Sequence, residues 1–421
     1  MWKIIYNILV NIALPFFIII SLFKKKIRKN LYERLFNSTK TNPLKNAIWI
    51  HGASIGEVVI AESIINFIRK TKKEFNMDFL VTTNTFYARD MVTKRFNKSV
   101  TVSSSPLDLT YTIERFIDSS TFKILIIVET EIWPNLIWTA KKHNIPVVIV
   151  NGRISDKALP GYTRFSFFLK HVLSCIDMVV TQSEEHRQRY ISIGMEPTNV
   201  ITTGNIKYFR EIPEMDESLE KADIVTFGSI KEKELDFVYK VIKRLKHVMP
   251  FLKIYIAPRE LHLAGSMEEE LKKDYRIMRY SALKKEKKDT YPEEVDFDVV
   301  IVDTVGDLLG IYKKSRVAFV GGSLAPYGGQ NILEPLFFST PVLFGPYVEN
   351  FKEISEMVLE RNAGFMVKDH EDLFERMRYL LENRDVTEKM GRNGIDIIQM
   401  HRGYMENTIE AIWRIMEKGK Q

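Results

Sequence analysis

Short apolar runs alternate with amphipathic stretches along most of the chain. The runs are rich in β-branched residues and have the length of buried strands, while the stretches between them repeat apolar positions at helical spacing. In the first half, the predicted helices include Val58–Lys72 and Trp133–His143. Alternation of this kind predicts a parallel sheet with helices on both faces. The strands predicted in this half are Ala47–His51, Phe79–Thr83, Phe122–Val128, Pro146–Val150 and Met178–Thr181.

The pattern restarts after a polar, proline-containing stretch, Glu211–Lys221. We therefore predict an α/β protein with two Rossmann-like, doubly wound domains that face a central cleft, with ligands at the carboxyl ends of the strands. The predicted domains are residues 30–213 and 214–421, and the last helix, Val386–Lys418, is expected to pack back on the first domain. The strands predicted in the second half are Asp223–Phe227, Lys253–Ala257, Phe297–Val302, Arg316–Val320 and Pro341–Phe344.

Residues 1–29 have a different pattern. Ile4–Phe23 contains no charged residue, and as a helix it would be roughly 30 Å long, enough to cross a bilayer. Asn7, Asn11 and Pro15 favour a tilted or partly inserted helix. A basic cluster follows at once, which is the reverse of a signal peptide and predicts a single anchor with a cytoplasmic body. The cluster should also attract anionic lipid headgroups. Its residues are Lys24, Lys25, Lys26, Arg28 and Lys29.

Composition adds little beyond this. The chain has 421 residues, of which 45% are hydrophobic, so it is long enough for two cores and unlike a disordered protein. Cys175 is its only cysteine, which excludes an internal disulfide and a cysteine-rich metal site. The net charge of +7 favours acidic partners without distinguishing nucleic acid from anionic lipid.

Candidate catalytic residues follow strands in the first half. Glu57 ends the segment HGASIGE at a strand-to-helix junction, where a carboxylate can act as a general base or simply complement the helix dipole. Glu129 and Glu131 follow the apolar strand Phe122–Val128, and two acids at a strand end favour function over capping. Lys207, in the segment GNIK, can offset negative charge on a phosphate or carboxylate.

The second half contains candidate donor-binding residues. Ser229 follows a predicted strand and is expected to precede a helix whose N–H groups bind phosphate. Pro258 and Arg259 end the next strand, and the guanidinium can contact the same phosphate. The glycine-rich segment GGSLAPYGGQNILEP at 321–335 is the most informative, because Glu334 can hold two ribose hydroxyls through its two oxygens.

These segments together resemble the Kdo (3-deoxy-D-manno-octulosonic acid) transferases, inverting glycosyltransferases of the GT-B fold. The resemblance covers nearly the whole chain, including the anchor, and its motifs are specific in this order and spacing. They are HGASIGE at 51–57, VETEIWPN at 128–135, GNIK at 204–207, DTVGDL at 303–308 and GGSLAPYGGQNILEP at 321–335.

The resemblance implies a role for each matching residue. Glu57 is the proton acceptor, and Glu131 and Lys207 stabilise the transition state. Ser229 is added from the helix-terminus argument and not from the family. The residues implied for the leaving group CMP are Pro258, Arg259, Gly306, Asp307, Leu308, Asn331, Ile332, Leu333 and Glu334.

The chain departs from the family pattern at three places around the donor. Gln330 stands where a histidine is usual, and residues 231–235 replace a Gly-Glu-Glu run. Pro258-Arg259 is followed by Glu-Leu-His in place of His-Pro-Glu-Arg. These changes affect the expected phosphate contacts but not the fold.

The implied reaction transfers Kdo from CMP-Kdo to lipid IVA, a lipid A precursor, during lipopolysaccharide biosynthesis at the bacterial inner membrane. It is expected to be inverting and independent of metal or cofactor, because the leaving group has one phosphate. The chain's Asp-x-Asp, at 296–298, precedes a strand and is interpreted as solvated. The implied partners are CMP-Kdo, the lipid acceptor and anionic inner-membrane lipids, with no nucleic acid.

Other functions fit parts of the sequence. A GT-B transferase using a UDP-sugar on another membrane acceptor would share the glycine-rich segment, and a sugar-nucleotide epimerase would share the fold. A non-catalytic, membrane-anchored lipid-binding protein is a third alternative, although carboxylates such as Glu57 and Glu131 would repel anionic lipid. The basic and aromatic stretch Arg153–Lys170 fits either a surface near the bilayer or an ordinary helix with its phenylalanines in the core.

Overall fold

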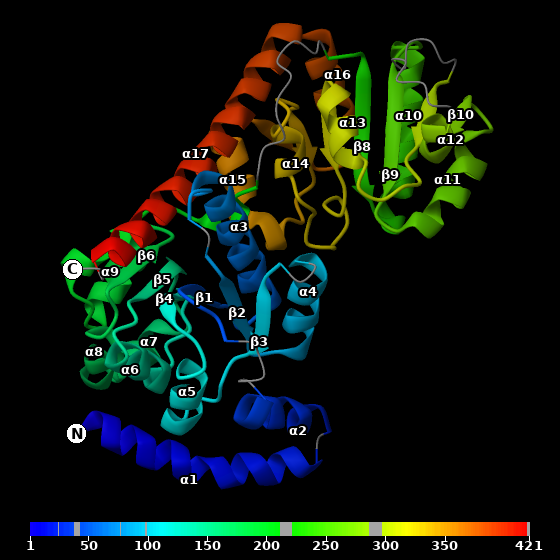
Figure 1. The fold of residues 1–421 in the computed structure, drawn as a ribbon. Helices are drawn as coiled ribbons and strands as arrows, with labels where there is room; N and C mark the ends of the chain where they lie inside the picture. The colour runs from blue at the N-terminus through cyan, green and yellow to red at the C-terminus, as the bar shows by residue number, and fades with distance from the viewer. Residues whose placement is uncertain are drawn as a thin grey trace. The chain divides into compact units, whose positions relative to one another are not determined.

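The computed structural model describes residues 1–23, 25–37, 43–75, 77–96, 99–210, 221–285 and 297–418. Two compact units are present, each built on its own sheet (Figure 1). The first comprises Met1–Arg210 and His401–Gln421, and the second comprises Glu211–Met400. The predicted domain boundary at 213/214 lies outside the described residues.

In the described residues of the first unit, seven parallel strands form one sheet in the order β3-β2-β1-β4-β5-β6-β7. The order reverses between β1 and β4, which places a topological switch point there. The strands are β1 (Ala47–His51), β2 (Phe79–Thr83), β3 (Thr101–Ser104), β4 (Phe122–Val128), β5 (Val147–Gly152), β6 (Met178–Thr181) and β7 (Val200–Thr202).

Helices cover both faces of this sheet (Figure 1). They are α3 (Ile55–Thr71), α4 (Phe86–Phe96), α5 (Thr110–Ile117), α6 (Pro134–Lys142), α7 (Leu159–Arg164), α8 (Ser166–Leu173) and α9 (Glu184–Ser192), with short turns η2 (Pro197–Asn199) and η3 (Ile206–Tyr208). Before the sheet come α1 (Trp2–Phe23), α2 (Lys25–Tyr32) and the π-helical turn η1 (Glu33–Asn37).

Strand β4 shows why these residues form a central strand. Ile124–Val128 is completely buried, and its side chains alternate between two core clusters. Ile124 and Ile126 pack in the cluster that contains α3, whereas Leu125 and Ile127 pack in the cluster that contains α6 and α8. A continuous apolar run is needed because both faces of a parallel sheet are covered.

In the described residues of the second unit, a parallel seven-stranded sheet has the order β10-β11-β9-β8-β12-β13-β14. Its switch point lies between β8 and β12. The strands are β8 (Ile224–Ile230), β9 (Lys253–Pro258), β10 (Ile277–Arg279), β11 (Val299–Ile301), β12 (Val317–Val320), β13 (Val342–Phe344) and β14 (Gly364–Met366). The helices are α10 (Leu235–Val248), α11 (Ala264–Leu271), α12 (Tyr280–Lys285), α13 (Leu308–Lys314), α14 (Leu333–Leu336), α15 (Lys352–Glu360) and α16 (His370–Glu382), with turns η4 (Glu232–Glu234), η5 (Leu261–Leu263) and η7 (Glu349–Phe351).

The final helix, α17 (Arg384–Lys418), belongs to both units. Met390 packs in a core cluster of the second unit, and Met405, Ile409 and Ile412 pack in the α3 cluster of the first. His401, the first α17 residue of the first unit, is buried, and its Nδ1 lies 3.3 Å from the Asn205 carbonyl oxygen. That contact fits a neutral ring that donates from Nδ1.

Burial lowers the pKa of His401 from 6.5 to about 4. Between these values the unfolded chain binds a proton that the folded chain does not, so stability falls as pH drops below about 6.5, by about 1.4 kcal/mol per pH unit. We expect His401→Asn to flatten this fall, measured as the melting temperature from about pH 7 to pH 5. The exposed His262→Asn should retain the wild-type slope, and an unchanged slope in His401→Asn would contradict the prediction.

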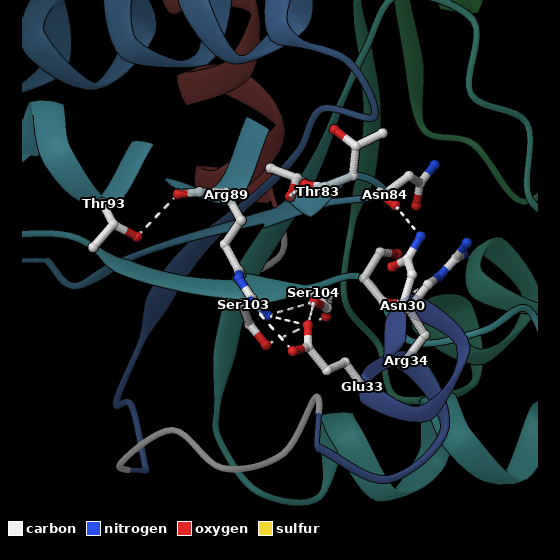
Figure 2. Close-up of polar contacts among 11 residues, drawn as sticks. Asn30, Glu33, Arg34, Thr83, Asn84, Arg89, Thr93, Ser103 and Ser104 are labelled. Carbon is white, nitrogen blue, oxygen red and sulfur yellow. Dashed lines mark hydrogen bonds and ion pairs between the residues drawn. The ribbon is translucent and has the colours of Figure 1, made fainter. Parts of the chain in front are cut away.

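Among the described residues, one helix, the N-terminal α1, is long and apolar enough to cross a membrane. The apolar segment is Trp2–Ile20, its mean hydropathy is 2.0, and none of it is buried. The chain after it is attached to the first unit (Figure 2). Asn30 donates to the Asn84 carbonyl oxygen (3.0 Å), and Arg34 Nε donates to the Ser105 carbonyl oxygen (3.0 Å). Glu33 pairs with Arg89 and accepts from the Ser104 hydroxyl (3.3 Å).

Candidate functional site

A pocket of about 390 Å³ lies in the first unit at the carboxyl ends of β1 and β4. This is the switch point, where the loops after neighbouring strands diverge and leave room for a ligand. All three predicted catalytic residues line it. The lining comprises Ser54, Gly56, Glu57, Glu129, Thr130, Glu131, Arg153, Ile154, Ser155, Ala158, Tyr162 and Lys207.

Glu57 helps to cap a helix and also lines the pocket. Glu57 lies in the first turn of α3 and is 8% exposed, and Ser54 is the N-cap of this helix. Its carboxylate oxygens accept from the Ala53 N–H (2.5 Å) and the Ser54 hydroxyl (2.8 Å), so it helps to cap the helix. Each oxygen has a second lone pair, which leaves the carboxylate able to accept a proton in the pocket.

Glu129 and Glu131 project from the turn after β4. Glu129 has φ = 61°, a left-handed conformation that costs a non-glycine residue about 1–2 kcal/mol. This conformation starts the turn in which the chain leaves β4. Burial raises the pKa of both carboxyls, and the negative charge of Glu57 raises both further. Trp133 Nε1 donates to Glu131 (2.7 Å), which fixes that side chain.

Lys207 and Arg153 supply positive charge to the same pocket, and both lower the pKa of Glu129 against the effect of burial. Lys207 follows Gly204, whose φ of +110° and close approach to the ring of Tyr404 require glycine. The Asn205 side chain accepts from the Lys207 N–H (3.0 Å). The segment GNIK thus holds an exposed lysine at the edge of an acidic pocket.

A second pocket, of about 470 Å³, lies in the second unit around the carboxyl ends of β8 and β9. Seven of the predicted donor-binding residues line it: Ser229, Pro258, Arg259, Gly306, Leu308, Asn331 and Glu334. Asn331 donates to Glu334 (3.3 Å), so the carboxylate is oriented before any ligand arrives. Gln330, which replaces the usual histidine, lies in the same wall.

Three predicted residues do not line this pocket. Asp307 pairs with Lys284 (2.8 Å), and the hydrogen bond to this lysine lowers the pKa of the Asp307 carboxyl. Ile332 and Leu333 are 0% and 1% exposed and belong to the core. Their side chains therefore lie in the interior and not at the surface of the pocket.

A family model described as 3-Deoxy-D-manno-octulosonic-acid transferase (kdotransferase) matches residues 29–210. The 3-deoxy-D-manno-octulosonic acid transferase of Haemophilus influenzae is 30% identical over 436 residues, covering 99% of this chain and 100% of that protein. The chain belongs to the Kdo transferase family. It is therefore a glycosyltransferase, and the epimerase and the non-catalytic lipid-binding protein are excluded.

Solved structures share the fold of this Kdo transferase. A glycosyltransferase from Rickettsia africae matches at 14% identity over 88% of this chain and 99% of that chain, with a TM-score of 0.51. UDP-GlcNAc 2-epimerase from Neisseria meningitidis matches at 12% identity over 88% of this chain and 100% of that chain, with a TM-score of 0.55. At these identities the likeness concerns the fold alone, and the predicted GT-B class is confirmed.

Glu234 is a site-supporting residue of this Kdo transferase that the sequence did not reveal. It is fully buried, and its two oxygens accept from the N–H groups of Gly322 (2.6 Å), Ser323 (2.9 Å), Leu324 (2.8 Å) and Lys231 (3.1 Å). These bonds fix the start of the glycine-rich loop after β12. A Cβ on Gly321 would lie 2.8 Å from the Glu234 carboxylate, so glycine is required there.

The predicted strand end at Phe227 is wrong, although a helix does follow Ser229 in the chain. Ser229 lies inside β8, and α10 begins only at Leu235, after the turn η4. The Glu234 carboxylate accepts from the Lys231 N–H and so helps to cap this turn. Ser229 still lines the second pocket, and its backbone φ is 57°.

Ser229 can be tested with two substitutions. Ser229→Ala and Ser229→Gly each remove the hydroxyl, and we expect each to weaken CMP binding roughly fivefold, about 1 kcal/mol for one hydrogen bond. Glycine also relieves the left-handed strain and should raise the free energy of unfolding by about 0.5–1 kcal/mol relative to alanine. Calorimetric titration with CMP and urea unfolding measure the two effects. Unchanged CMP affinity in both variants would remove Ser229 from the donor site.

Proposed function

We propose that this Kdo transferase moves Kdo from CMP-Kdo to a lipid IVA-type acceptor, with inversion and without a metal ion. The main support for this proposal is that the two pockets carry different functional groups. The first has carboxylates for proton transfer to or from an acceptor, and the second combines Arg259 with Glu334, which suits a nucleoside monophosphate.

The proposed step is a single displacement. Glu57 takes the proton from the acceptor hydroxyl, and the oxygen forms a bond to the anomeric carbon of Kdo. The bond from that carbon to the phosphate oxygen of CMP breaks, and CMP leaves with the electron pair. Attack opposite to the leaving group inverts the configuration. Glu131 and Lys207 are proposed to stabilise the charge that develops at the sugar and at the phosphate.

We propose that arginine, lysine and backbone N–H groups neutralise the single phosphate of CMP in place of a metal. Within the part of the chain that the structure describes, one group of ligand-type side chains lies close enough to share an ion: Glu114, Asp118 and His143. None of the three lines either pocket. Asp298 of the Asp-x-Asp segment pairs with Lys246 and Arg276, and Asp296 lies outside the described residues.

The proposed location is the cytoplasmic face of the bacterial inner membrane. Helix α1 presents large apolar side chains, of which Phe16 and Phe17 are 65% and 61% exposed. The basic residues that follow it in the sequence would attract anionic headgroups. Such a helix holds the enzyme where an acylated acceptor resides.

A transfer assay tests the proposed function. The purified protein in detergent receives CMP-Kdo generated in situ and a tetraacylated lipid A precursor, with EDTA in one arm and a UDP-sugar replacing CMP-Kdo in another. Extension of the lipid by Kdo in both the EDTA and the EDTA-free arms supports the proposal, and the anomeric configuration of the product reports inversion. Consumption of the UDP-sugar without Kdo transfer would overturn the donor, and loss of activity in EDTA would overturn metal independence.

A further inference from the structure

An apolar groove of about 620 Å³ lies in the first unit between α1 and the helices α7 and α8. Its walls are aromatic and aliphatic, and several are open to solvent, among them Phe165 and Phe167, which are 54% and 51% exposed. The core alternative is therefore wrong for Phe165 and Phe167, whereas Phe168 packs against a core cluster. The groove is lined by Trp2, Ile5, Tyr6, Leu9, Ala158, Gly161, Tyr162, Phe165, Phe167, Phe168 and Leu169.

One face of α1 docks against the first unit. Trp2, Tyr6 and Val10 repeat every fourth position and, with Asn7, are partly buried, whereas the other residues of Met1–Val10 are exposed. The Trp2 ring lies 5.0 Å from that of Phe167, and the Tyr6 ring lies 5.7 Å from that of Phe168. Polar bonds fix the register.

These polar bonds come from two neighbouring residues. The Tyr6 hydroxyl donates to Asp108 (2.7 Å), and Asn7 donates to Asn135 (3.0 Å) and accepts from the Thr110 hydroxyl (2.9 Å). Asp108 also accepts from the Leu136 N–H (2.9 Å), at the start of α6. The asparagine that weakens a membrane span is thus a docking residue.

Both ends of α1 are held to the same unit. Its first turns bond to Asp108 and Asn135, and the chain beyond its last turn is attached through Asn30 and Arg34 (Figure 2). A span would separate the ends by a hydrocarbon layer of about 30 Å with polar media on opposite sides. A helix attached at both ends to one folded unit instead lies in the membrane plane, with its outer apolar face in the lipid.

The groove continues into the acidic pocket. Ala158 and Tyr162 line both cavities. Tyr162 therefore lies between the apolar walls of the groove and the carboxylates of the acidic pocket. Burial raises the pKa of its hydroxyl, and the negative charge of Glu131 raises it further. A ligand with a polar hydroxyl and an apolar tail matches this sequence of surfaces.

We propose that the groove between α1 and α7–α8 receives an acyl chain of the acceptor and thereby places the acceptor's sugar hydroxyl in the acidic pocket. The inference rests on the proposed function. A chain reaches the groove from the lipid layer in which α1 lies, without leaving apolar surroundings. The groove therefore selects acylated acceptors and sets their register.

Gly161 allows a direct test, because a Cβ there meets nothing within 4 Å and a larger side chain can enter the groove. We expect Gly161→Phe to raise the KM for the tetraacylated acceptor about tenfold, the effect of displacing roughly two methylene groups. The KM for CMP-Kdo and the melting temperature should stay close to wild type. Gly265→Phe, at an equally open helical glycine of the second unit, is the matched control.

A second readout is photocrosslinking from a diazirine at the end of one acyl chain. Crosslinks to peptides 2–9 and 159–169 that decrease in Gly161→Phe support the groove. An unchanged acceptor KM in Gly161→Phe, or crosslinks confined to other segments, would overturn it, and protection by ordinary phospholipid alone would assign the groove to bulk lipid. Absence of Kdo transfer by the wild type would instead refute the proposed function.

Discussion

Replacing Glu57 by glutamine is expected to stop transfer in a protein that stays folded. The glutamine oxygen can still accept from the Ala53 N–H, and its NH2 can donate to the Ser54 hydroxyl, but glutamine cannot take a proton from the acceptor. We expect kcat to fall about a hundredfold to ten-thousandfold, the usual effect of losing a general base. Steady-state transfer to the tetraacylated acceptor measures the fall, and calorimetric titration should show unchanged CMP binding.

The capping role of Glu57 requires its own control. Ser183 caps α9 in the same unit by accepting from the His186 N–H, and it lines neither the acidic pocket nor the groove. Ser183→Ala should lose about 1 kcal/mol of stability, like other lost caps, and keep its activity. If Glu57→Gln loses only stability and turns over at the wild-type rate, Glu57 is a cap, and Glu129→Gln and Glu131→Gln would then locate the base.

Glu234→Gln is expected to damage the donor site from a position outside it. In the wild type, backbone N–H groups donate to the Glu234 carboxylate inside a fully buried site. In the variant, the NH2 of the glutamine would face some of these N–H groups, so that donors would meet donors. We expect a loss of about 3 kcal/mol in the free energy of unfolding and at least about tenfold weaker CMP binding, because the glycine-rich loop is no longer preorganised. Hydrogen exchange in residues 321–325 should become faster.

The neighbouring Glu232 is the matched control, since it lies in the same turn but is exposed. Glu232→Gln should resemble the wild type in all three measurements. Lower stability in Glu234→Gln together with unchanged CMP affinity would show that the glycine-rich loop does not contribute to CMP binding. The second pocket would then have to bind a ligand other than CMP.

The interior strands could be predicted closely from the sequence because burial on both faces demands continuous apolar runs. Phe79–Thr83 and Phe122–Val128 were predicted with the bounds that the structure has. The outer strands β3, β7, β10 and β14 were missed, since an outer strand is short and partly exposed and its sequence need not be apolar.

The candidate site was predictable where it depends on strand ends and not where it depends on distant partners. Glu57, Glu131 and Lys207 share a pocket because parallel strands end at one edge. The role of Glu234 depends on a loop about 90 residues later, and no local pattern carries that information. Likewise, the docking of α1 depends on Asp108 and Asn135, so its sequence alone predicted an ordinary anchor.

The division of α17 between the units has a consequence for biosynthesis. When residues 1–210 have left the ribosome, the apolar face of α3 and its neighbours still lacks Met405, Ile409 and Ile412, which lie beyond the entire second unit. The first unit to be translated is therefore the last to be completed, and its apolar surface stays exposed until the last turns of α17 have been synthesised. A stop codon near residue 400 would consequently harm the N-terminal unit, far from the truncation in sequence, more than the unit that it directly follows.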